Sequence, residues 1–392
     1  SELTLRECAM LAGVTTNPYY YNPRRNFYTR TSDTTDYKAI TNNRTDYVLR
    51  CMYENEFITQ QQYQEALDPS TAHVLETSTT EGDGMYQYAH YVEYAVQDIV
   101  DCFLELNGLE DTSENRSKME NELRTGGYHV TLAIDTEIQE IVEETLETWD
   151  KYPALRDPSD KVYRTLNYDG TYDEIVQPQA AAVVLDYRTG ELKAIVGSRT
   201  RPTARKTLNR ATDMKMPVGS SIKPLSVYGP AIDMGLITPA TVIDDSPYNN
   251  SRAGGWPINT PAGYRGLTMV SDALKRSVNT VAVKIMANYS SPELAYQYLT
   301  GENGFGITTL VESKEINGQT YSDIDIAPLA LGGLTDGVST YEMAAAYATF
   351  ANNGIYREPT TYLRVIDSDD TVLLDNSSYV GEPVLQEDTV FY

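Results

Sequence analysis

Residues 217–224 read Pro-Val-Gly-Ser-Ser-Ile-Lys-Pro and contain the chain's single Ser-x-x-Lys sequence. Ser220 and Lys223 are three positions apart, so a helix places both side chains on one face, within reach of each other. Gly219 lets the backbone turn into that helix, whose N-terminal N–H groups suit an alkoxide nucleophile and an oxyanion. A lysine kept neutral by desolvation takes the proton of the hydroxyl. We therefore predict a serine nucleophile with a lysine base.

Two competing interpretations of this stretch remain open at this point. The first is an ordinary helix start, because a Ser-x-x-Lys sequence arises easily by chance. The second is a Ser-His-Asp triad, which is the weaker idea because no histidine lies nearby and no Gly-x-Ser-x-Gly occurs.

A second candidate group follows further along the chain, where residues 275–280 read Lys-Arg-Ser-Val-Asn-Thr. Ser277 and Asn279 are two apart and diverge on a helix, so pointing both into one cleft requires a loop or a helix end. There a hydroxyl relays a proton and an amide binds a substrate amide; the alternative is a capping serine and a surface asparagine. Ser-x-x-Lys followed by Ser-x-Asn resembles the motif order of serine acyltransferases that act on penicillin-like substrates.

Composition narrows the class of protein. The 392 residues suggest two or three domains, and the net charge of −25, from 31 basic and 56 acidic residues, argues against nucleic-acid binding. The same charge argues against electrostatic attachment to anionic lipid. The three cysteines form no Cys-x-x-Cys and no His-Glu-x-x-His occurs, so neither a disulfide framework nor a zinc site is expected.

Hydrophobic periodicity and turn residues predict the main elements. Helices are expected over 3–13, 42–55, 59–67, 86–106, 136–149 and 340–352. Strands are expected over 128–134, 180–185 and 192–196, with a strand pair within 360–375. Residues 68–84 are rich in Ser, Thr, Asp and Gly, which predicts a linker or a long loop.

Taken together, these blocks resemble class A, bifunctional penicillin-binding proteins of the bacterial cell wall. Residues 3–23, 46–52 and 57–67 are similar to the end of a peptidoglycan glycosyltransferase domain, and residues 126–144 to the linker that follows it. The blocks that are similar to the transpeptidase domain are residues 180–197, 217–224, 266–284 and 329–353. Each block is moderately specific, whereas their order along the chain is highly specific.

The resemblance implies an α+β fold: a penicillin-binding, serine β-lactamase-like transpeptidase domain with an antiparallel sheet flanked by helices. It implies a glycosyltransferase tail over 1–80, an interdomain linker region over 81–178 and a transpeptidase domain over 179–392.

The resemblance also implies the roles of individual residues. Ser220 is similar to the acylated nucleophile, Lys223 to the lysine that activates it, and Ser277 and Asn279 to the proton-transfer and amide-binding residues. The Ser220 N–H forms half of the oxyanion hole, and Gly219 and Trp256 are expected to contribute to substrate binding. The implied reaction is D,D-transpeptidation of peptidoglycan stem peptides, inhibited by β-lactams, with no metal or cofactor.

The chain departs from the family pattern in two ways. The third motif, Lys-[Thr/Ser]-Gly, does not occur in these residues, because Arg188-Thr189-Gly190 precedes the nucleophile and lies in a turn. The glycosyltransferase carboxylates and the membrane anchor are expected before Ser1. We therefore expect a fragment of a protein on the outer side of the bacterial cytoplasmic membrane, and slow or undetectable acylation of the isolated chain.

Three other functions remain open from the sequence. A carboxypeptidase or a β-lactamase resolves the acyl-enzyme with water, but the glycosyltransferase-like tail argues against both. A degenerate, non-catalytic scaffold or sensor fits the missing third motif, but not the presence of Ser220, Lys223, Ser277 and Asn279 together.

Overall fold

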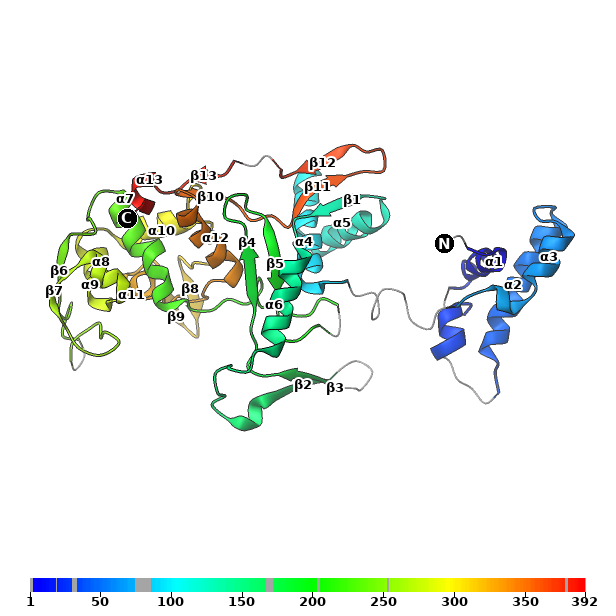
Figure 1. Cartoon of the computed structure of the whole chain (residues 1–392), viewed down its shortest axis with the longest axis horizontal. Helices are drawn as coiled ribbons and strands as arrows, with labels where there is room; N and C mark the ends of the chain where they lie inside the picture. Colours follow the sequence, from blue (N-terminus) through cyan, green and yellow to red (C-terminus); the bar gives the residue numbers. More distant parts are fainter. Residues whose placement is uncertain are drawn as a thin grey trace. The chain divides into compact units, whose positions relative to one another are not determined.

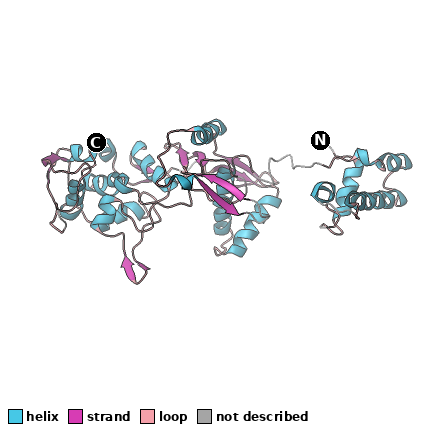
Figure 2. Ribbon diagram, turned by 90° about the horizontal axis from the view of Figure 1, so that it is seen from below, coloured by secondary structure: helices cyan, strands magenta, loops and turns pink. Residues whose placement is uncertain are grey.

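A computed structural model describes residues 3–18, 20–29, 34–74, 86–166, 172–202, 205–251, 254–377 and 380–391. The chain divides into two compact units, residues 1–87 and residues 88–392. Helices and antiparallel strand pairs are both present, so the predicted α+β class is confirmed (Figures 1 and 2). The predicted domain limits at residues 80 and 178 stay a prediction.

The first unit is helical, as its sequence predicts. It contains α1 (Leu5–Val14), α2 (Tyr37–Glu54) and α3 (Gln60–Ala66), with a π-helical turn at Arg25–Thr29 and a 3₁₀ turn at Pro69–Thr71. Capping boxes begin α1 at Thr4 and α3 at Thr59. The three helices enclose a small apolar cluster of Ala9, Leu49, Ile58 and Ala66. The predicted linker at 68–84 falls largely outside the described residues.

The second unit holds the remaining elements. Its helices are α4 (Ala89–Leu106), α5 (Ser113–Thr125), α6 (Thr136–Thr148), α7 (Gly229–Asp233), α8 (Val270–Lys275), α9 (Asn279–Asn288), α10 (Pro292–Thr300), α11 (Ile326–Leu331), α12 (Thr340–Ala351) and α13 (Glu387–Phe391). Its strands are β1 (His129–Leu132), β2 (Val162–Leu166), β3 (Tyr172–Val176), β4 (Ala182–Leu185), β5 (Leu192–Val196), β6 (Val242–Asp245), β7 (Gly266–Met269), β8 (Lys314–Ile316), β9 (Gln319–Tyr321), β10 (Ile355–Tyr356), β11 (Tyr362–Ile366), β12 (Val372–Asp375) and β13 (Glu382–Pro383).

A three-stranded antiparallel sheet joins distant parts of this unit in the order β1-β11-β12. Helices α4 and α5 pack together beside it, and Ile99, Phe103, Met119 and Val365 share one buried cluster. The sequence predicted these strands but not α5, because Met119 is the helix's only buried residue and its apolar periodicity is therefore weak.

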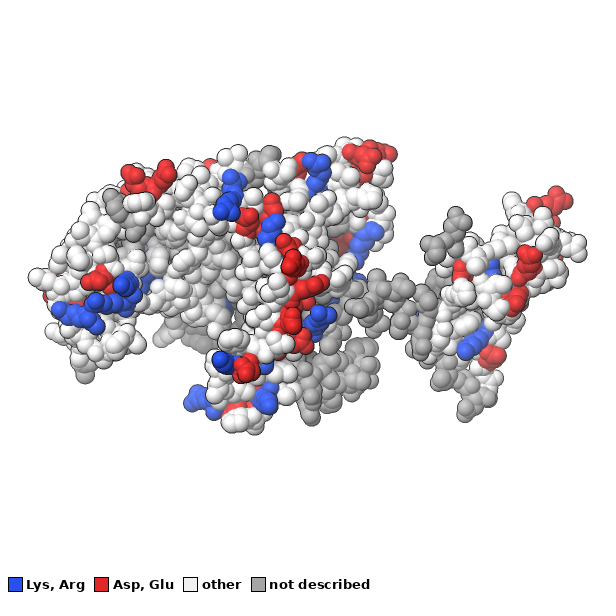
Figure 3. Space-filling view, in the orientation of Figure 1, with Lys and Arg blue, Asp and Glu red and all other residues white. Residues whose placement is uncertain are grey.

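A second antiparallel pair, β4–β5, forms the predicted hairpin around the turn at residues 188–191. Helix α6 packs against β5, and α12 packs against β4. Asp135 caps α6 by accepting hydrogen bonds from the N–H groups of Glu137 and Ile138, as the sequence predicts. The exposed side of α6 carries glutamates, and an acidic band crosses this region in Figure 3.

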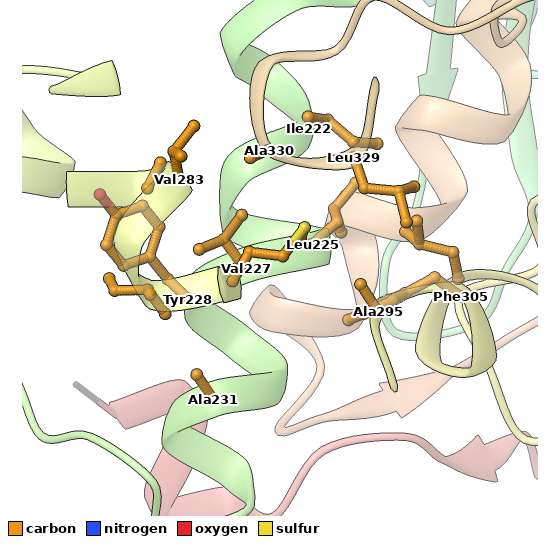
Figure 4. Packing of buried hydrophobic residues seen from close by; sticks show 14 of the residues in the cluster. Ile222, Leu225, Val227, Tyr228, Ala231, Val283, Ala295, Phe305, Leu329 and Ala330 are labelled. Atoms are coloured by element: carbon orange, nitrogen blue, oxygen red, sulfur yellow. The ribbon is translucent and has the colours of Figure 1, made fainter. Parts of the chain in front are cut away.

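The largest core lies around the segment that follows the Ser-x-x-Lys sequence. A 3₁₀ turn at Gly219–Ile222 leads into a π-helical turn at Pro224–Tyr228 and then into α7. Ile222, Leu225, Val227, Tyr228 and Ala231 of this segment are buried against residues of α9, α10 and α11 (Figure 4). The segment is therefore anchored by its apolar side chains, which leaves its first turn at the protein surface.

The helix predicted for Ser220 and Lys223 thus begins as a 3₁₀ turn instead of an α-helix. Proline at 224 has no N–H group to donate to the Ser220 carbonyl, and the N–H of Lys223 donates to that carbonyl instead.

Candidate active site

Ser220 occupies the first turn of the central helical segment. Gly219 before it has a φ of +56°, in the left-handed region that glycine adopts readily. The Ser220 side chain is exposed, and among the described residues none is hydrogen-bonded to its hydroxyl. The hydroxyl is therefore accessible to a substrate.

Lys223 lies one turn further on and is 1% exposed. Its Nζ donates to the Ser277 carbonyl oxygen at 2.8 Å, to Ser277 Oγ at 3.1 Å and to Asn279 Oδ1 at 2.6 Å. The structure thus brings three of the four predicted catalytic residues into direct contact. All three acceptors are neutral, so they satisfy the ammonium without supplying an opposite charge.

Burial changes the acid–base behaviour of this lysine. Desolvation disfavours the charged form, which lowers the pKa of Lys223 to about 8. A general base works best when its pKa is close to the working pH. About one tenth of Lys223 is therefore neutral at pH 7, and this neutral form can take a proton from a serine.

The Ser277 backbone explains how two residues that diverge on a helix reach one lysine. Ser277 lies between α8 and α9 with a φ of +54°, and Asn279 is the first residue of α9. The left-handed residue turns the chain so that the Ser277 carbonyl, its hydroxyl and the Asn279 amide all contact Lys223 Nζ. The sequence-based requirement for a helix end is therefore met.

The Asn279 amide has a defined orientation. Its Nδ2 donates to the Ile258 carbonyl oxygen at 2.8 Å, so Oδ1 faces Lys223. An amide nitrogen carries two hydrogens, and the second remains for a substrate carbonyl.

Trp256 lies in the loop between β6 and β7. Its ring is half-buried against the main core and makes an edge contact with Tyr248, with ring centroids 6.1 Å apart. These contacts are those of a packing residue, and its predicted role in substrate binding stays a prediction.

Two residues next to the site were missed by sequence reasoning. Asn259 contacts the backbone of Asn279, and the buried Asp245 contacts Asn259. These contacts join residues 20 and 14 positions apart, so neither helical spacing nor strand alternation indicates them.

The backbone before Ser220 is braced by Gly332. The Gly219 N–H donates to the Gly332 carbonyl oxygen at 3.1 Å, and Gly332 has a φ of +75°. A Cβ on Gly332 would lie 2.0 Å from Gly219 O, whereas a Cβ on Gly333 would meet nothing within 4 Å. Only a glycine at 332 allows this approach.

We therefore expect Gly332→Ala to lower the free energy of unfolding by about 2–4 kcal/mol, through left-handed strain and the clash with Gly219. Urea denaturation of the unaltered chain and of both alanine variants measures the effect. Gly333→Ala is the matched control and should stay within about 1 kcal/mol of the unaltered chain. Equal stability of the two variants would contradict the role assigned to Gly332.

Within the described ranges, no three His, Cys, Asp or Glu side chains are grouped so as to hold a metal ion. No helix in the same ranges combines the length and the apolar character needed to span a bilayer.

Comparison with known proteins identifies relatives of the whole chain. A family model described as "Penicillin binding protein transpeptidase domain" matches residues 180–390. Penicillin-binding protein 1A of Clostridium acetobutylicum is 32% identical over 96% of this chain and 43% of its own length. Penicillin-binding protein 1A of Clostridium botulinum, strain Langeland, is 33% identical over 95% of this chain and 42% of its own length. The chain therefore spans less than half the length of these curated relatives.

Solved structures share the fold. Penicillin-binding protein 1A from Haemophilus influenzae matches with a TM-score of 0.62 and 19% identity, over 100% of this chain and 66% of that one. PonA1 from Mycobacterium tuberculosis, solved in complex with penicillin V, matches with a TM-score of 0.56 and 21% identity, over 78% of this chain and 69% of that one.

Proposed function

Because the chain belongs to the class A penicillin-binding proteins, we propose that it carries the acyl-transfer site of a peptidoglycan D,D-transpeptidase. The observation that supports this most is the environment of Lys223, a buried lysine whose pKa is lowered to about 8 and which contacts Ser277 and Asn279. A degenerate scaffold has no use for a buried lysine whose pKa is lowered toward neutral pH. The proposed substrates are stem peptides that end in D-Ala-D-Ala, and the proposed inhibitors are β-lactams.

In the proposed acylation step, Ser220 Oγ attacks the carbonyl carbon of the penultimate D-Ala while its proton passes to neutral Lys223 Nζ. The N–H of Ser220 donates to the developing oxyanion. The peptide bond to the terminal D-Ala then breaks, and the Lys223 proton reaches the leaving amine by way of the Ser277 hydroxyl. The products are an ester on Ser220 and free D-Ala.

In the second step, an amine of a neighbouring stem peptide attacks the ester carbonyl. Its proton returns through Lys223 to Ser220 Oγ as the ester bond breaks, so a new peptide bond forms and the enzyme is regenerated. Asn279 Nδ2 holds the donor peptide by its free hydrogen, with Gly219 and Trp256 as further proposed substrate contacts. The chain needs no metal or cofactor for either step.

The proposed function also implies a cellular location for this domain. Peptidoglycan lies outside the cytoplasmic membrane, so we place this domain on that side, held by an anchor elsewhere in the whole protein. The net charge of −25 is unsuited to binding anionic lipid or nucleic acid directly.

A competition experiment tests the substrate class. The chain is incubated with a fluorescent penicillin for an extended period, and intact mass and fluorescence report the adduct. We expect slow, rather than undetectable, formation of one adduct per chain, because Lys223 already contacts Ser277 and Asn279 and the Ser220 hydroxyl is exposed. An acyl-D-Ala-D-Ala peptide should slow labelling at least about threefold, whereas its L-Ala-L-Ala counterpart should not, because binding sites that pair specific groups discriminate strongly.

Each alternative outcome has a definite meaning. Equal protection by the two peptides would contradict D,D specificity. Absence of an adduct after prolonged incubation would contradict the acyl-transfer function for this chain.

A further inference from the structure

We propose that Asn259 and Asp245 are positioning residues that orient Asn279 toward Lys223 through a chain of buried hydrogen bonds. The chain runs from Asp245 on β6, through Asn259 in the loop that follows, to the first residues of α9. Neither residue contacts the lysine directly in any hydrogen bond, so their effect on the site passes through Asn279. The consequence for acylation rests on the proposed function, whereas the consequence for Lys223 itself does not.

Helix α9 begins without a capping side chain from its own N-cap residue. The N-cap position is occupied by Val278, whose apolar side chain cannot accept a hydrogen bond. The first N–H groups of a helix have no partners within it. Asn259 Oδ1 supplies the missing acceptor, at 2.9 Å from the Asn279 nitrogen and 3.3 Å from the Thr280 nitrogen. Asn259 therefore caps α9 from 20 positions earlier in the chain.

The Asn259 amide is held in one orientation by its hydrogen bonds. Its Nδ2 donates to Asp245 Oδ1 at 2.8 Å and to the Gly263 carbonyl oxygen at 2.9 Å. Both amide hydrogens are thus used on one side, which leaves Oδ1 facing α9. A reversed amide would direct N–H groups at the N–H groups of Asn279 and Thr280, and both interactions would be lost.

The Asp245 carboxylate is itself held by hydrogen bonds. This side chain is 1% exposed, and burying a carboxylate is costly unless hydrogen bonds satisfy it. Besides Asn259 Nδ2, its donors are the Thr280 hydroxyl and the Arg265 N–H, the latter at 2.9 Å. Because Thr280 belongs to the first turn of α9, the carboxylate holds that turn by a second route.

Ile258, next to Asn259, connects this network to Lys223 by way of Asn279. The Ile258 carbonyl, adjacent to Asn259, accepts the Asn279 Nδ2 hydrogen and so directs Oδ1 at Lys223 Nζ, 2.6 Å away. The segment 258–259 therefore fixes both the backbone and the amide of Asn279. Without Asn259, the shortest of the three hydrogen bonds to the lysine loses its fixed acceptor.

Asn259→Ala tests this inference, with Asn250→Ala as the matched control, because Asn250 is an exposed asparagine of the same loop. The readout is an NMR titration of the Lys223 side chain, assigned by its loss in Lys223→Arg. Hydrogen bonds to a charged group favour the charged form. We expect the pKa of Lys223 in Asn259→Ala to fall below its value in the unaltered chain, and the pKa in Asn250→Ala to stay unchanged.

A second readout is the rate of penicillin acylation at its alkaline plateau, where Lys223 is neutral in every variant. We expect about a tenfold loss in Asn259→Ala, because small displacements of a catalytic group reduce rates strongly. Asp245→Asn keeps the shape of the side chain and removes its charge. Like Asn259→Ala, Asp245→Asn should lower both the pKa of Lys223 and the acylation rate. It replaces Asn259→Ala in both measurements if that variant does not fold.

An unchanged pKa of Lys223 in a folded Asn259→Ala protein would overturn the inference. A rise toward the value of an exposed lysine, about 10.4, would also overturn it, since the role of Asn259 would then be to exclude water. If the unaltered chain forms no penicillin adduct, the proposed function fails, but the NMR titration still tests the positioning role independently.

Discussion

The Ser220→Ala variant should form no covalent adduct with a fluorescent penicillin, whereas Ser221→Ala should still form one. These neighbouring serines are both exposed and both lie in the 3₁₀ turn that precedes the buried lysine. Only Ser220 stands three positions before Lys223. Intact mass spectrometry of the unaltered chain and both variants, after the same prolonged incubation, measures the adduct directly.

Hydrogen bonding explains why the two serines differ. Ser221 Oγ donates to the Val218 carbonyl oxygen at 2.6 Å, and the Ser221 carbonyl accepts a hydrogen bond from Tyr347 at 2.6 Å. Ser221 thus supports the turn, and removing its hydroxyl costs about 1 kcal/mol. An adduct on Ser220→Ala would show that an exposed hydroxyl elsewhere reacts. Loss of the adduct in Ser221→Ala alone would show that Ser221, and not Ser220, is the nucleophile.

Much of the fold follows from local sequence. The helices at α1, α3, α6 and α12 begin where Thr4, Thr59, Asp135 and Ser339 cap them, and capping residues are visible in the sequence. The hairpin β4–β5 is equally local, because its turn and its alternating strands are adjacent in the chain. By contrast, the pairing of β1 with β11 joins segments more than two hundred residues apart, and strand periodicity does not reveal partners.

The candidate site likewise has residues that local sequence predicts and contacts that only the structure shows. Ser220 and Lys223 are linked by helical spacing, and Ser277 and Asn279 by a short motif, so the sequence predicts all four as candidate residues. The contact of Lys223 with Asn279, and the support from Asn259, depend on how the loop before β7 folds over the start of α9. A polar residue in a loop has no periodic pattern to mark it, so Asn259 could be recognised only from its contacts.

The Lys223→Met variant should retain the fold and lose about 10²- to 10⁴-fold in the rate of penicillin acylation, the usual contribution of a general base. Methionine has a similar length and is accepted in buried positions, but it cannot take a proton. The rate is measured from the growth of the adduct mass with time. Lys275→Met is the matched control, because Lys275 is exposed in the last turn of α8 and should leave the rate unchanged.

The role of Lys223 as the base also predicts how the acylation rate of the unaltered chain changes with pH. Only neutral Lys223 accepts the Ser220 proton, and burial lowers its pKa to about 8. The neutral fraction is then about one tenth at pH 7, about one half at pH 8 and about nine tenths at pH 9. The acylation rate should therefore rise roughly tenfold between pH 7 and pH 9 and level off above that. Lys223→Met should show a low, flat profile over the same range, since it has no group to titrate there. A flat profile in the unaltered chain, or an acylation rate in Lys223→Met close to that of Lys275→Met, would contradict the assignment of Lys223 as the base.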